Sequence, residues 1–529
     1  MNRLSNLLPV AHPSDRRFWS MKRLPKISIE SGSQKCRSLV LKATWGAPLA
    51  LALVAFLLRV SYLDAQSLWR DEMDVLRFAH QPAAELLRNL AQVKYNGPLY
   101  YILMRGWLAL AGDSEFALRF LAACAGVLAV PLTGWIGRVL VGRRAAWLAA
   151  LLVAVSPYMV WYSQEAKMYA LVGALTLLAM ACQLGALRTG RAGWWAGFVV
   201  AASLSFYVHL LAALLIPVYA ALFLLAWPRY RSRWRGWLAS LAALTLPYVP
   251  LAIWQLPLVI DTYSTGHPFY SMQDILASLF NLYARGVALV GGWVVVAVFL
   301  FAVLGGIFGP PFSRRRGREE GGRGEGLSGA RLRLFLLVWL FLPIGVVYLV
   351  SLRAPIFEPR YMIFVAPAFY LLAGLGVRVL SRSWRPAAGF SLAVMLSFSL
   401  LGVWTQATAP LKSDFRAAAA YVAAHRQGSA PIMFHIPYVR YTFDYYFHGD
   451  YAALEGPWTN DGQTEAQVDA AMARLLADYS SIWVVSSESW LWDSRGLVRS
   501  WFDRRARPVE SAHFALVDVY HYDLSGRPR

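Results

Sequence analysis

Two adjacent carboxylates, Asp71 and Glu72, follow the first long apolar run of this 529-residue chain. They stand in SLWRDEMDV, directly after a segment long enough to cross a bilayer. Ionisable groups beside a membrane are costly to keep, so the pair indicates a site that uses charge, although a solvated loop start is the simpler alternative. Neighbouring side chains on a helix point in different directions, so we expect only one of the two to face the site. A carboxylate placed there can act as a general base.

Further ionisable side chains stand beside later apolar runs: Glu165 and Lys167 in YSQEAKMYA, Arg360 in IFEPRYMIF, and two histidines, His209 and His267. Each has a plain alternative, namely a local ion pair, an arginine that reaches the headgroups, or a histidine with no further role. Together they combine a carboxylate base with cations that can bind phosphate. This combination suits transfer from a lipid-linked phosphate donor, because the lipid stays in the bilayer while its head reaches the surface.

The composition is that of a polytopic membrane protein. Hydrophobic residues make up 58% of the chain and charged residues 15%, whereas soluble domains have roughly 25% charged residues. The net charge of +21 does not form one patch, since the arginines fall in short clusters between apolar runs. That pattern is typical of cytoplasmic loops and argues against nucleic-acid binding. We find no zinc-finger spacing, P-loop or dinucleotide fingerprint.

Apolar runs predict about eleven membrane helices by the usual length criterion. They lie at about 44–63, 116–140, 145–162, 168–187, 193–209, 210–227, 236–257, 290–309, 334–352, 361–379 and 386–404. The stretch PLYYILMRGWLAL (98–110) is apolar but short, so we expect a helix lying in the interface. Counting it as a span would reverse the sidedness of every later loop.

The basic loops set the predicted orientation. VGRRA, RTGRAG, PRYRSRWR, SRRRGREEGGRGEG and SRSWRP all fall on one side when 98–110 does not span. The positive-inside rule makes this side cytoplasmic and places the N-terminus there, in the plasma (inner) membrane. Asp71, Glu165 and Arg360 then share the opposite, outer side.

The ends of the chain differ from its middle. Residues 1–43 predict a basic, disordered cytoplasmic tail, with Met21 as an alternative start, and 44–404 form the membrane domain. Residues 405–529 are polar and predict an external α/β domain, because the helical stretches SDFRAAAAYVAAH and EAQVDAAMARLLADY alternate with the strands APIMFHI and SSIWVVSS. Ser413 or Asp414 can cap the first of these helices. No cysteine follows Cys182, so disulfides cannot hold this domain.

Several motifs together resemble a known family. SLWRDEMDV, YNGPLYYILMRGWLALAGDSEFALRF and GRRAAWLAALLVAVSPYMVWYSQEAKMYAL are similar to the bacterial relatives of dolichyl-phosphate-mannose–protein mannosyltransferases. These are GT-C glycosyltransferases, close to the lipid A aminoarabinose transferases and the rhizobial lipopolysaccharide core transferases. EPRYMIFVAPAFYLLAG and KSDFRAAAAYV continue the resemblance, which covers most of 44–425.

The resemblance implies transfer of a sugar from a polyprenyl-phosphate donor to an envelope glycan, lipid or protein outside the cytoplasm, with inversion at the anomeric carbon. The family's acidic residue in the first external loop matches Asp71, and its SQEAR motif matches Ser163–Lys167 with lysine in place of arginine. Its HPPLYY is NGPLYY here, so Asn96 replaces histidine and Gly97 replaces proline. Asn can orient a substrate but cannot titrate, and Lys lacks the bidentate fork of Arg.

The predicted site therefore has three groups of residues, with a divalent metal ion as an optional cofactor. The catalytic candidates are Asp71, Glu72 and Glu165. The candidates for donor phosphate binding are Lys167, Arg360 and Lys94. The candidates for substrate binding are Asn96, Tyr100, Tyr162, Gln164, His209 and His267.

Two other functions stay open at this stage. A flippase for a lipid-linked saccharide would need polar or broken helices near the midplane of the bilayer. Pro247 and Pro250 interrupt one span, but charged residues at the midplane are scarce. A non-catalytic scaffold of an envelope complex would use the external domain for binding.

Overall fold

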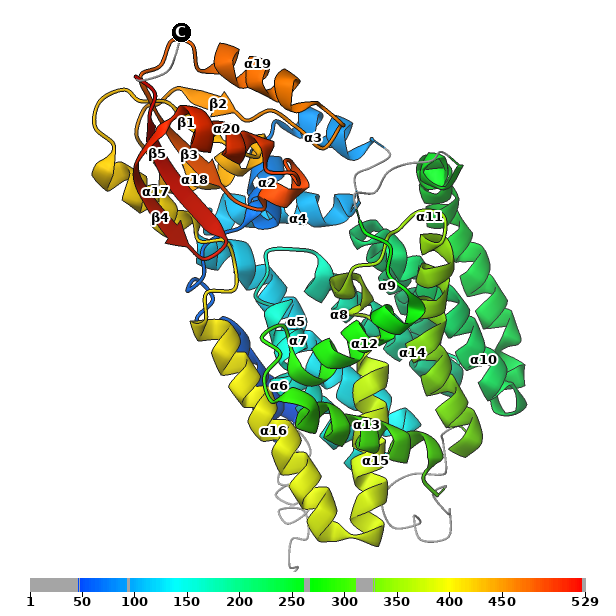
Figure 1. The fold of residues 1–529 in the computed structure, drawn as a ribbon. Coiled ribbons are helices and arrows are strands. Elements are labelled where there is room, and N and C mark those ends of the chain that lie inside the picture. The colour runs from blue at the N-terminus through cyan, green and yellow to red at the C-terminus, as the bar shows by residue number, and fades with distance from the viewer. Residues whose placement is uncertain are drawn as a thin grey trace, which may run out of the picture. The chain divides into compact units, whose positions relative to one another are not determined.

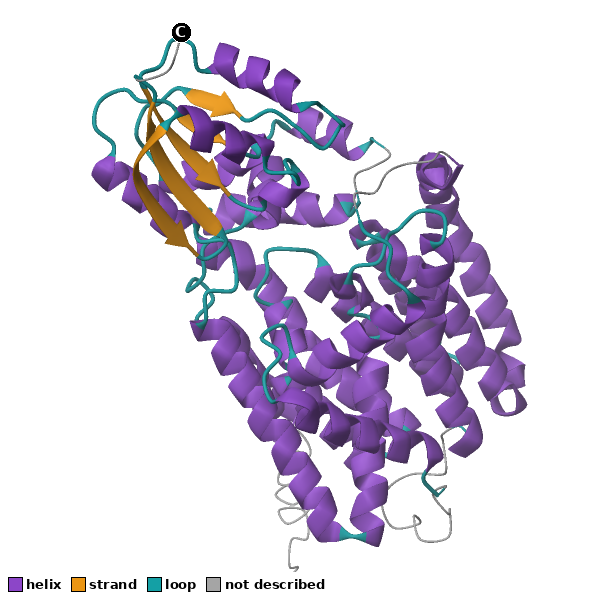
Figure 2. Cartoon of the chain, in the orientation of Figure 1, coloured by secondary structure: helices purple, strands orange, loops and turns teal. Residues whose placement is uncertain are grey.

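The structure is a computed structural model that describes residues 46, 48–92, 96–260, 267–310, 327 and 329–525. Helices make up most of these residues, and one small sheet lies in the C-terminal part (Figure 1, Figure 2). The predicted fold class, a largely helical membrane protein with a small α/β domain, is thereby confirmed. The predicted tail 1–43 lies outside the described residues.

Among the described residues, five helical stretches are long and apolar enough to cross a membrane. They are α5 (Glu115–Leu140), α8 (Tyr169–Thr189), the run Leu210–Gln255, α14 (Gly329–Ser351) and α16 (Arg385–Thr408). The run Leu210–Gln255 includes α10 (Ile216–Tyr230) and most of α11 (Trp234–Ile260). Shorter apolar helices are Pro48–Val60, α9 (Ala192–Val208) and α13 (Gly292–Phe308). Each coincides with a predicted apolar run.

The remaining helices of the membrane region explain two departures from the prediction. The run 145–162 is divided into α6 (Arg143–Val155) and α7 (Pro157–Trp161), because Pro157 starts a new helix that the side chain of Ser156 caps. A helix that the sequence did not predict, α12 (Met272–Arg285), packs against α7, α13 and α16. The last predicted span but one is α15 (Ala366–Ser383).

Helix α15 lies close to its neighbours because small residues line its contacts. A Cβ atom on Gly374 would meet the carbonyl oxygen of Ala145 at 2.8 Å and the backbone nitrogen of Ala149 at 2.9 Å. Small residues at such positions let helix backbones approach, which is the usual basis of helix packing inside a bilayer. The bundle therefore depends on close backbone contact as well as on large side chains.

A buried arginine connects the helix Pro48–Val60 to the bundle. The Arg59 side chain is fully buried. Its Nη1 donates to the Ala154 carbonyl at 3.0 Å, its Nη2 to Val153 at 3.2 Å, and its Nε to the Ser163 hydroxyl at 3.2 Å. The two carbonyls lie at the end of α6, where helical carbonyls lack intrahelical partners, and Ser163 follows α7.

Three short helices follow the first span. They are α2 (Arg70–His80), α3 (Ala83–Leu90) and α4 (Pro98–Ala111). Helix α4 matches the predicted helix at 98–110, and its placement in the interface stays a prediction. It begins after Gly97, whose φ of +80° favours glycine, and a Cβ there would meet the carbonyl oxygen of Val208 at 2.7 Å.

The C-terminal sheet has five strands in the order β2-β1-β3-β5-β4. The strands are β1 (Ile432–Phe434), β2 (Ala453–Glu455), β3 (Ser481–Ser486), β4 (Arg507–Phe514) and β5 (Val517–Asp523). Strand β1 pairs in parallel with β2 and β3, whereas β5 pairs antiparallel with β3 and β4. The predicted strands APIMFHI and SSIWVVSS are thus β1 and β3.

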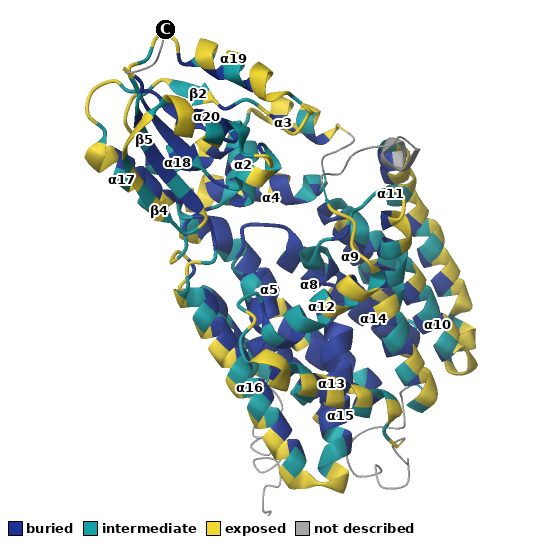
Figure 3. Cartoon of the chain, viewed as in Figure 1, coloured by how far each residue is buried: buried dark blue, intermediate teal, exposed yellow. Residues whose placement is uncertain are grey.

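Helices pack on both faces of this sheet, as the alternation along β3 requires. Trp483 and Val485 belong to a core with α17 (Phe415–His425) and α18 (Arg440–Tyr446), whereas Ile482 and Val484 belong to a core with α19 (Glu465–Leu475) and α20 (Leu497–Arg505). The inner strands β1, β3 and β5 are largely buried, whereas the edge strands β2 and β4 are not, and Figure 3 shows much of α19 exposed. Asp414 caps α17 as predicted.

Candidate active site

Helix α2 directs Asp71 and Glu72 to different surroundings. Both stand in its first turn, where free backbone NH groups favour carboxylates. Val75, Leu76 and Ala79 are buried and fix the orientation of the helix. The side chain of Glu72 is fully buried, whereas that of Asp71 is 16% exposed. The expectation that only one of the pair faces a given site fits this geometry.

Glu72 belongs to a closed cluster, which we define as Glu72, Arg119 and Lys412. Arg119 donates from Nε to Oε1 of Glu72 at 2.8 Å and from Nη2 to Oε2 at 2.7 Å. Lys412 Nζ lies 3.1 Å from Oε1, and the backbone NH of Ala166 donates to the same oxygen at 3.0 Å. Burial would raise the pKa of Glu72, but these partners lower it to about 2.

The closed cluster positions the loop that leads into α2. Arg119 also donates to the carbonyls of Leu63, Gln66 and Ser67. Both oxygens of Glu72 are bonded and its side chain is fully buried, so a substrate cannot reach it to give up a proton. The geometry gives this residue a positioning role, and we route no catalytic step through it.

Asp71 belongs to an open cluster, which we define as Asp71, Glu165, Lys167 and Arg360. Arg360 Nη1 lies 2.9 Å from Oδ2 of Asp71 and 4.0 Å from Oε1 of Glu165. Arg70 Nε lies 3.4 Å from Oδ1 of Asp71. Three segments that are far apart in the sequence thus bring their predicted site residues together.

The two carboxyl groups of the open cluster differ in acidity. Burial raises the pKa of Asp71, but Lys167, Arg360 and Arg70 bring it below its usual value. Burial raises the pKa of Glu165, and Arg360 and Lys412 offset only part of this rise. Neighbouring carboxyls whose pKa values are pushed in opposite directions are characteristic of acid–base sites.

Buried polar atoms of the open cluster are not all satisfied. Glu165 Oε2 and Arg360 Nε are buried and have no hydrogen-bond partner among the described residues. Burial opposes the charge of Lys167, but Tyr101, Asp71 and Asp74 raise its pKa, so the ammonium group persists. An unsatisfied buried carboxylate oxygen beside two cations is expensive unless a ligand uses it.

Aromatic rings surround the guanidinium of Arg360. Its central carbon lies 5.5 Å from the ring centre of Trp69, 5.6 Å from that of Tyr169 and 5.9 Å from that of Tyr361. Rings at this distance stabilise a cation through their faces and leave its NH groups free to bind an anion.

Both predicted histidines lie next to these rings. The His209 ring centre is 5.1 Å from that of Tyr361, and the His267 ring centre is 6.2 Å from it. His267 Nδ1 also lies 3.4 Å from Oε1 of Glu358, two residues before Arg360. Both histidines therefore lie beside the residues that surround Arg360, as members of the site would.

Two residues predicted to bind substrate, Asn96 and Gln164, instead form hydrogen bonds with the backbone. Asn96 Oδ1 accepts from the backbone NH of Leu210 at 2.9 Å and so fixes the turn that follows His209. Gln164 Nε2 donates to three carbonyls at the end of the first span, among them that of Ser61 at 3.0 Å. Both side chains position the elements that carry the site.

The predicted tyrosines lie near the clusters. Tyr100 is buried, its hydroxyl has no partner among the described residues, and burial together with Tyr101, Glu72 and Glu165 raises its pKa. The Tyr162 ring centre is 5.9 Å from that of Tyr169, which borders Arg360. Lys94, a predicted phosphate ligand, lies outside the described residues.

Comparisons with known proteins agree with the fold. Residues 95–254 match the family model described as dolichyl-phosphate-mannose-protein mannosyltransferase. ArnT from Cupriavidus metallidurans bound to undecaprenyl phosphate is 13% identical, with 91% of this chain and 98% of that chain covered and a TM-score of 0.53. Its apo state gives 14% identity, coverage of 90% and 98%, and a TM-score of 0.55.

A second relative is archaeal. The Archaeoglobus fulgidus oligosaccharyltransferase, in a complex with Zn and sulfate, is 14% identical, with 83% of this chain and 68% of that chain covered and a TM-score of 0.52. No curated protein matches the sequence. The fold is that of the GT-C glycosyltransferases. At these identities, the likeness to solved structures shows the fold alone.

Two residues of the closed cluster, Arg119 and Lys412, were not predicted from the sequence. Arg119 interrupts the apolar run FALRFL, and a charge inside a span is a recognised sign of a buried partner. Lys412 opens KSDFRAAAAYV, just after the last apolar run. A search for charges within or just after spans would have found both.

The residues of this site do not fit a metal centre well. Over the described ranges, no group of three or more His, Cys, Asp or Glu side chains lies close enough together to hold an ion. Asp71 and Glu165 share their surroundings with the cations Arg360 and Lys167, which neutralise them. We therefore route no step of the mechanism through the optional metal.

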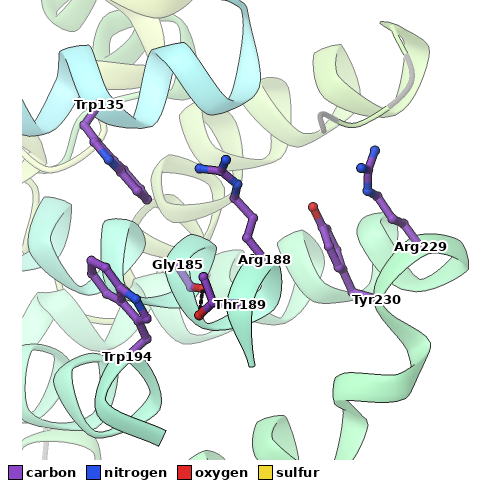
Figure 4. Close-up of a pocket in the computed structure, with 7 residues that line it drawn as sticks. All are labelled: Trp135, Gly185, Arg188, Thr189, Trp194, Arg229 and Tyr230. Carbon is purple, nitrogen blue, oxygen red and sulfur yellow. Dashed lines mark hydrogen bonds between the residues drawn. The ribbon is translucent and has the colours of Figure 1, made fainter. Parts of the chain in front are cut away.

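A cavity of about 290 Å³ lies elsewhere in the GT-C bundle, and none of the predicted site residues line it. Figure 4 shows the rings of Trp135 and Trp194 facing each other, with centres 6.2 Å apart, and Arg188 and Arg229 pointing in the same direction. Its other lining residues are Gly185, Thr189 and Tyr230. It is separate from the open cluster.

Proposed function

We propose that this chain is a membrane glycosyltransferase that moves a sugar, a hexose or pentose, from a polyprenyl-phosphate donor to an acceptor outside the cytoplasm. The observation that carries the proposal is the open cluster, in which Arg360 lies within 4.0 Å of both Asp71 and Glu165. The GT-C fold, the mannosyltransferase family match and the relative bound to undecaprenyl phosphate support it.

The donor phosphate binds to the cations of the open cluster. Arg360 offers its buried Nε, and Lys167 offers a second positive charge. Arginine binds phosphate through two NH groups, whereas lysine acts as a point charge. The leaving group of the reaction is a phosphate that gains negative charge, so these cations stabilise it more in the transition state than in the donor.

Donor binding also activates the base. In the structure Arg360 pairs with Asp71 and helps to hold the pKa of that carboxyl down. A phosphate that shares Arg360 weakens this pair, and the pKa of Asp71 then rises towards its ordinary value. A carboxylate with a higher pKa is a stronger base, so Asp71 becomes effective when the donor is in place.

The reaction is a single displacement. The acceptor hydroxyl gives its proton to Asp71, and its oxygen forms a bond to the anomeric carbon. The bond between that carbon and the phosphate oxygen breaks, and polyprenyl phosphate leaves with the electron pair. Attack from the face opposite the leaving group inverts the anomeric centre. Glu165, whose Oε2 lacks a partner among the described residues, accepts a hydrogen bond from a hydroxyl of the sugar or acceptor.

The test uses the full chain reconstituted into liposomes that contain a radiolabelled polyprenyl-phosphate sugar and a cell-envelope extract as the acceptor. We expect the label to leave the lipid and join the extract covalently. Label that crosses the bilayer but stays on its lipid would make the chain a flippase. Label that neither joins the extract nor crosses the bilayer would favour the non-catalytic scaffold.

The orientation is tested separately, because the proposal needs the N-terminus in the cytoplasm and the C-terminal domain outside. Single cysteines placed at the exposed residues Asp113 and Arg353, in the loops that follow α4 and α14, should both react with a membrane-impermeant maleimide added from outside when the native cysteines are removed. Reaction of the two from opposite sides would overturn the proposal.

A further inference from the structure

Two loops of the C-terminal domain carry exposed aromatic rings. We call Trp458, Trp490 and Trp492 of these loops, together with Tyr438 of the short helix Pro437–Val439, the aromatic platform; the rings of Trp492 and Tyr438 are half-buried. Trp458 is 48% exposed and Trp490 is 64% exposed. Large aromatic side chains carry much apolar surface, and several gathered on the outside of a folded domain mark a binding surface.

The loops of the platform are tied to each other. The backbone NH of Thr459 donates to the Trp492 carbonyl at 3.0 Å, and Asn460 Nδ2 donates to the Trp490 carbonyl at 3.2 Å. Trp492 Nε1 donates to the Gly456 carbonyl at 3.0 Å. These bonds join residues 456–464 to residues 488–495, so the rings are held in place before any ligand arrives, which lowers the entropic cost of binding.

The platform continues into the open cluster. The ring centres of Trp458 and Trp492 are 5.7 Å apart, and those of Trp492 and Tyr438 are 6.0 Å apart. The hydroxyl of Tyr438 accepts from Arg70 Nη1 at 3.3 Å. Arg70 in turn lies 3.4 Å from Asp71. A continuous chain of contacts therefore leads from Trp458 to Asp71, the residue that takes the acceptor's proton, and an acceptor of more than one sugar unit can span it.

A residue with unusual backbone geometry holds this arrangement. Glu488 has a φ of +48°, in the left-handed region that a residue with a side chain rarely adopts. Its Oε2 lies 3.5 Å from Arg70 Nη1. Such strain persists where the surrounding contacts require it, and it is concentrated at functional sites. The ion pair between Glu488 and Arg70 keeps the loop 488–495 against α2.

We propose that the aromatic platform binds a sugar ring of the acceptor, so that the acceptor is a saccharide or a glycolipid. The inference rests on the proposed function and specifies its acceptor. One face of a pyranose ring is made of CH groups that stack on aromatic rings, while the hydroxyls at its edge bond to polar side chains. Asn460, Asp461 and Ser494 are exposed polar residues of the same two loops. Asn460 is used in the contacts between the loops, whereas the Asp461 carboxylate bonds only to its neighbour Gln463 and keeps lone pairs that can accept from a sugar hydroxyl.

The charges of the two loops argue against a bilayer as the ligand. Residues 456–464 contain no Lys or Arg, and Arg495 is the only one in 488–495. The Arg495 guanidinium donates to the carbonyls of Thr459 and Gln463, at 2.6 and 2.5 Å. Surfaces that bind anionic lipid headgroups present clusters of basic residues, which these loops lack.

The kinetic test uses the reconstituted full chain, a labelled polyprenyl-phosphate sugar, and a protease-treated glycan extract of the cell envelope as the acceptor probe. We expect Trp458→Ala and Trp490→Ala each to raise the apparent KM for the extract about 5- to 30-fold, with kcat changed less than about twofold. This corresponds to a loss of roughly 1–2 kcal/mol of binding per ring. Trp458→Phe should keep most of the affinity, because it keeps an aromatic face.

Val509→Ala, an exposed apolar residue on β4, is the matched control and should leave KM unchanged. Periodate, which opens sugar rings at neighbouring hydroxyls, should raise the KM of the wild-type protein for the treated extract. An unchanged KM in both tryptophan variants, or a KM insensitive to periodate, would overturn the platform assignment.

A binding measurement keeps this result distinct from failure of the proposed function. If the wild-type protein never releases sugar from the donor, the glycosyltransferase proposal fails. The tryptophan fluorescence of the same protein is then titrated with the glycan extract and with phosphatidylglycerol vesicles. Saturable quenching by the glycan that Trp458→Ala weakens supports the platform. Quenching by vesicles alone, or by neither probe, refutes it.

Discussion

Two clusters of buried charge begin at neighbouring residues of α2, and they differ in how fully their hydrogen-bonding groups are used. In the closed cluster, Arg119 holds both oxygens of Glu72, and Lys412 and a backbone NH add to the same carboxylate. In the open cluster, Glu165 Oε2 and Arg360 Nε are buried without a hydrogen-bond partner among the described residues, although Glu358 Oε2 lies 3.9 Å from that Nε. The two clusters contain the same types of residue but differ in how many of their buried polar atoms are hydrogen-bonded.

This difference separates a cluster that positions parts of the fold from one that can act on a substrate. A fully buried carboxylate with both oxygens bonded holds its partners in place, and a substrate cannot reach it. A cluster that leaves buried atoms unsatisfied pays a cost that a ligand can recover. Variants of the two clusters should therefore fail in different ways, and the following experiments compare them.

The largest effect is expected for Asp71→Asn, which removes the base and keeps the shape of the side chain. Transfer of labelled sugar should fall by about 10²–10⁴-fold, the usual contribution of a general base. The melting temperature of the purified protein should stay close to that of the wild type. Asp113→Asn, at an exposed aspartate, is the control. Undiminished transfer in Asp71→Asn would remove the base assignment.

Glu72→Gln should act on stability. The substitution leaves the buried charges of Arg119 and Lys412 without their carboxylate, and breaking a buried pair in this way costs about 3–5 kcal/mol. We expect a melting temperature several degrees lower and a smaller amount of folded protein in the membrane. Glu85→Gln, at an exposed glutamate of α3, should change neither. A stable Glu72→Gln protein with no transfer would instead give Glu72 a part in the chemistry.

Acid should reduce the difference between wild type and Glu72→Gln. The pKa of Glu72 is about 2 in the folded protein, below the ordinary value of 4.5. Its contribution to stability, roughly 3 kcal/mol for a shift of this size, is complete above pH 4.5 and is lost as the pH falls towards 2. Melting temperatures of the two proteins should converge over this range. A difference that persists at pH 2 would contradict the ion-pair account.

Arg360→Lys should have the smallest effect of the four. Lysine keeps the charge beside Asp71 but loses the fork that binds phosphate through two NH groups. We expect kcat/KM for the donor to fall about 10- to 100-fold, mainly through a higher KM. Arg353→Lys, at an exposed arginine of the same loop, is the control. A loss confined to thermal stability would place Arg360 with the closed cluster.

Much of the fold was predictable because length and apolarity define a span. The runs at 116–140, 168–187 and 386–404 correspond to α5, α8 and α16 within a few residues. Helix α12 was not predicted, since MQDILASLFNLYAR is short for a span and mixes polar with apolar residues. The strand β5 was also missed, although VDVYHYD alternates as a half-buried strand should.

The site was predictable in its members but not in its pairings. Asp71, Glu165 and Arg360 were assigned to one side of the membrane by counting spans, and the structure brings them together. The sequence could not show that Glu72 faces Arg119 and Lys412, because such pairing depends on how α2 is rotated against α5 and the end of α16. That rotation is set by buried residues such as Val75 and Leu76, whose partners lie far along the chain.

The contacts of Arg59 have a consequence for biosynthesis. Its acceptors at Val153, Ala154 and Ser163 are made roughly ninety to a hundred residues after it. The first hydrophobic segment therefore leaves the ribosome with a guanidinium that has no companion yet, and water or lipid headgroups must solvate it until the later helices insert. Nascent chains arrested before residue 153 should be extracted from the membrane more easily than chains arrested after residue 163.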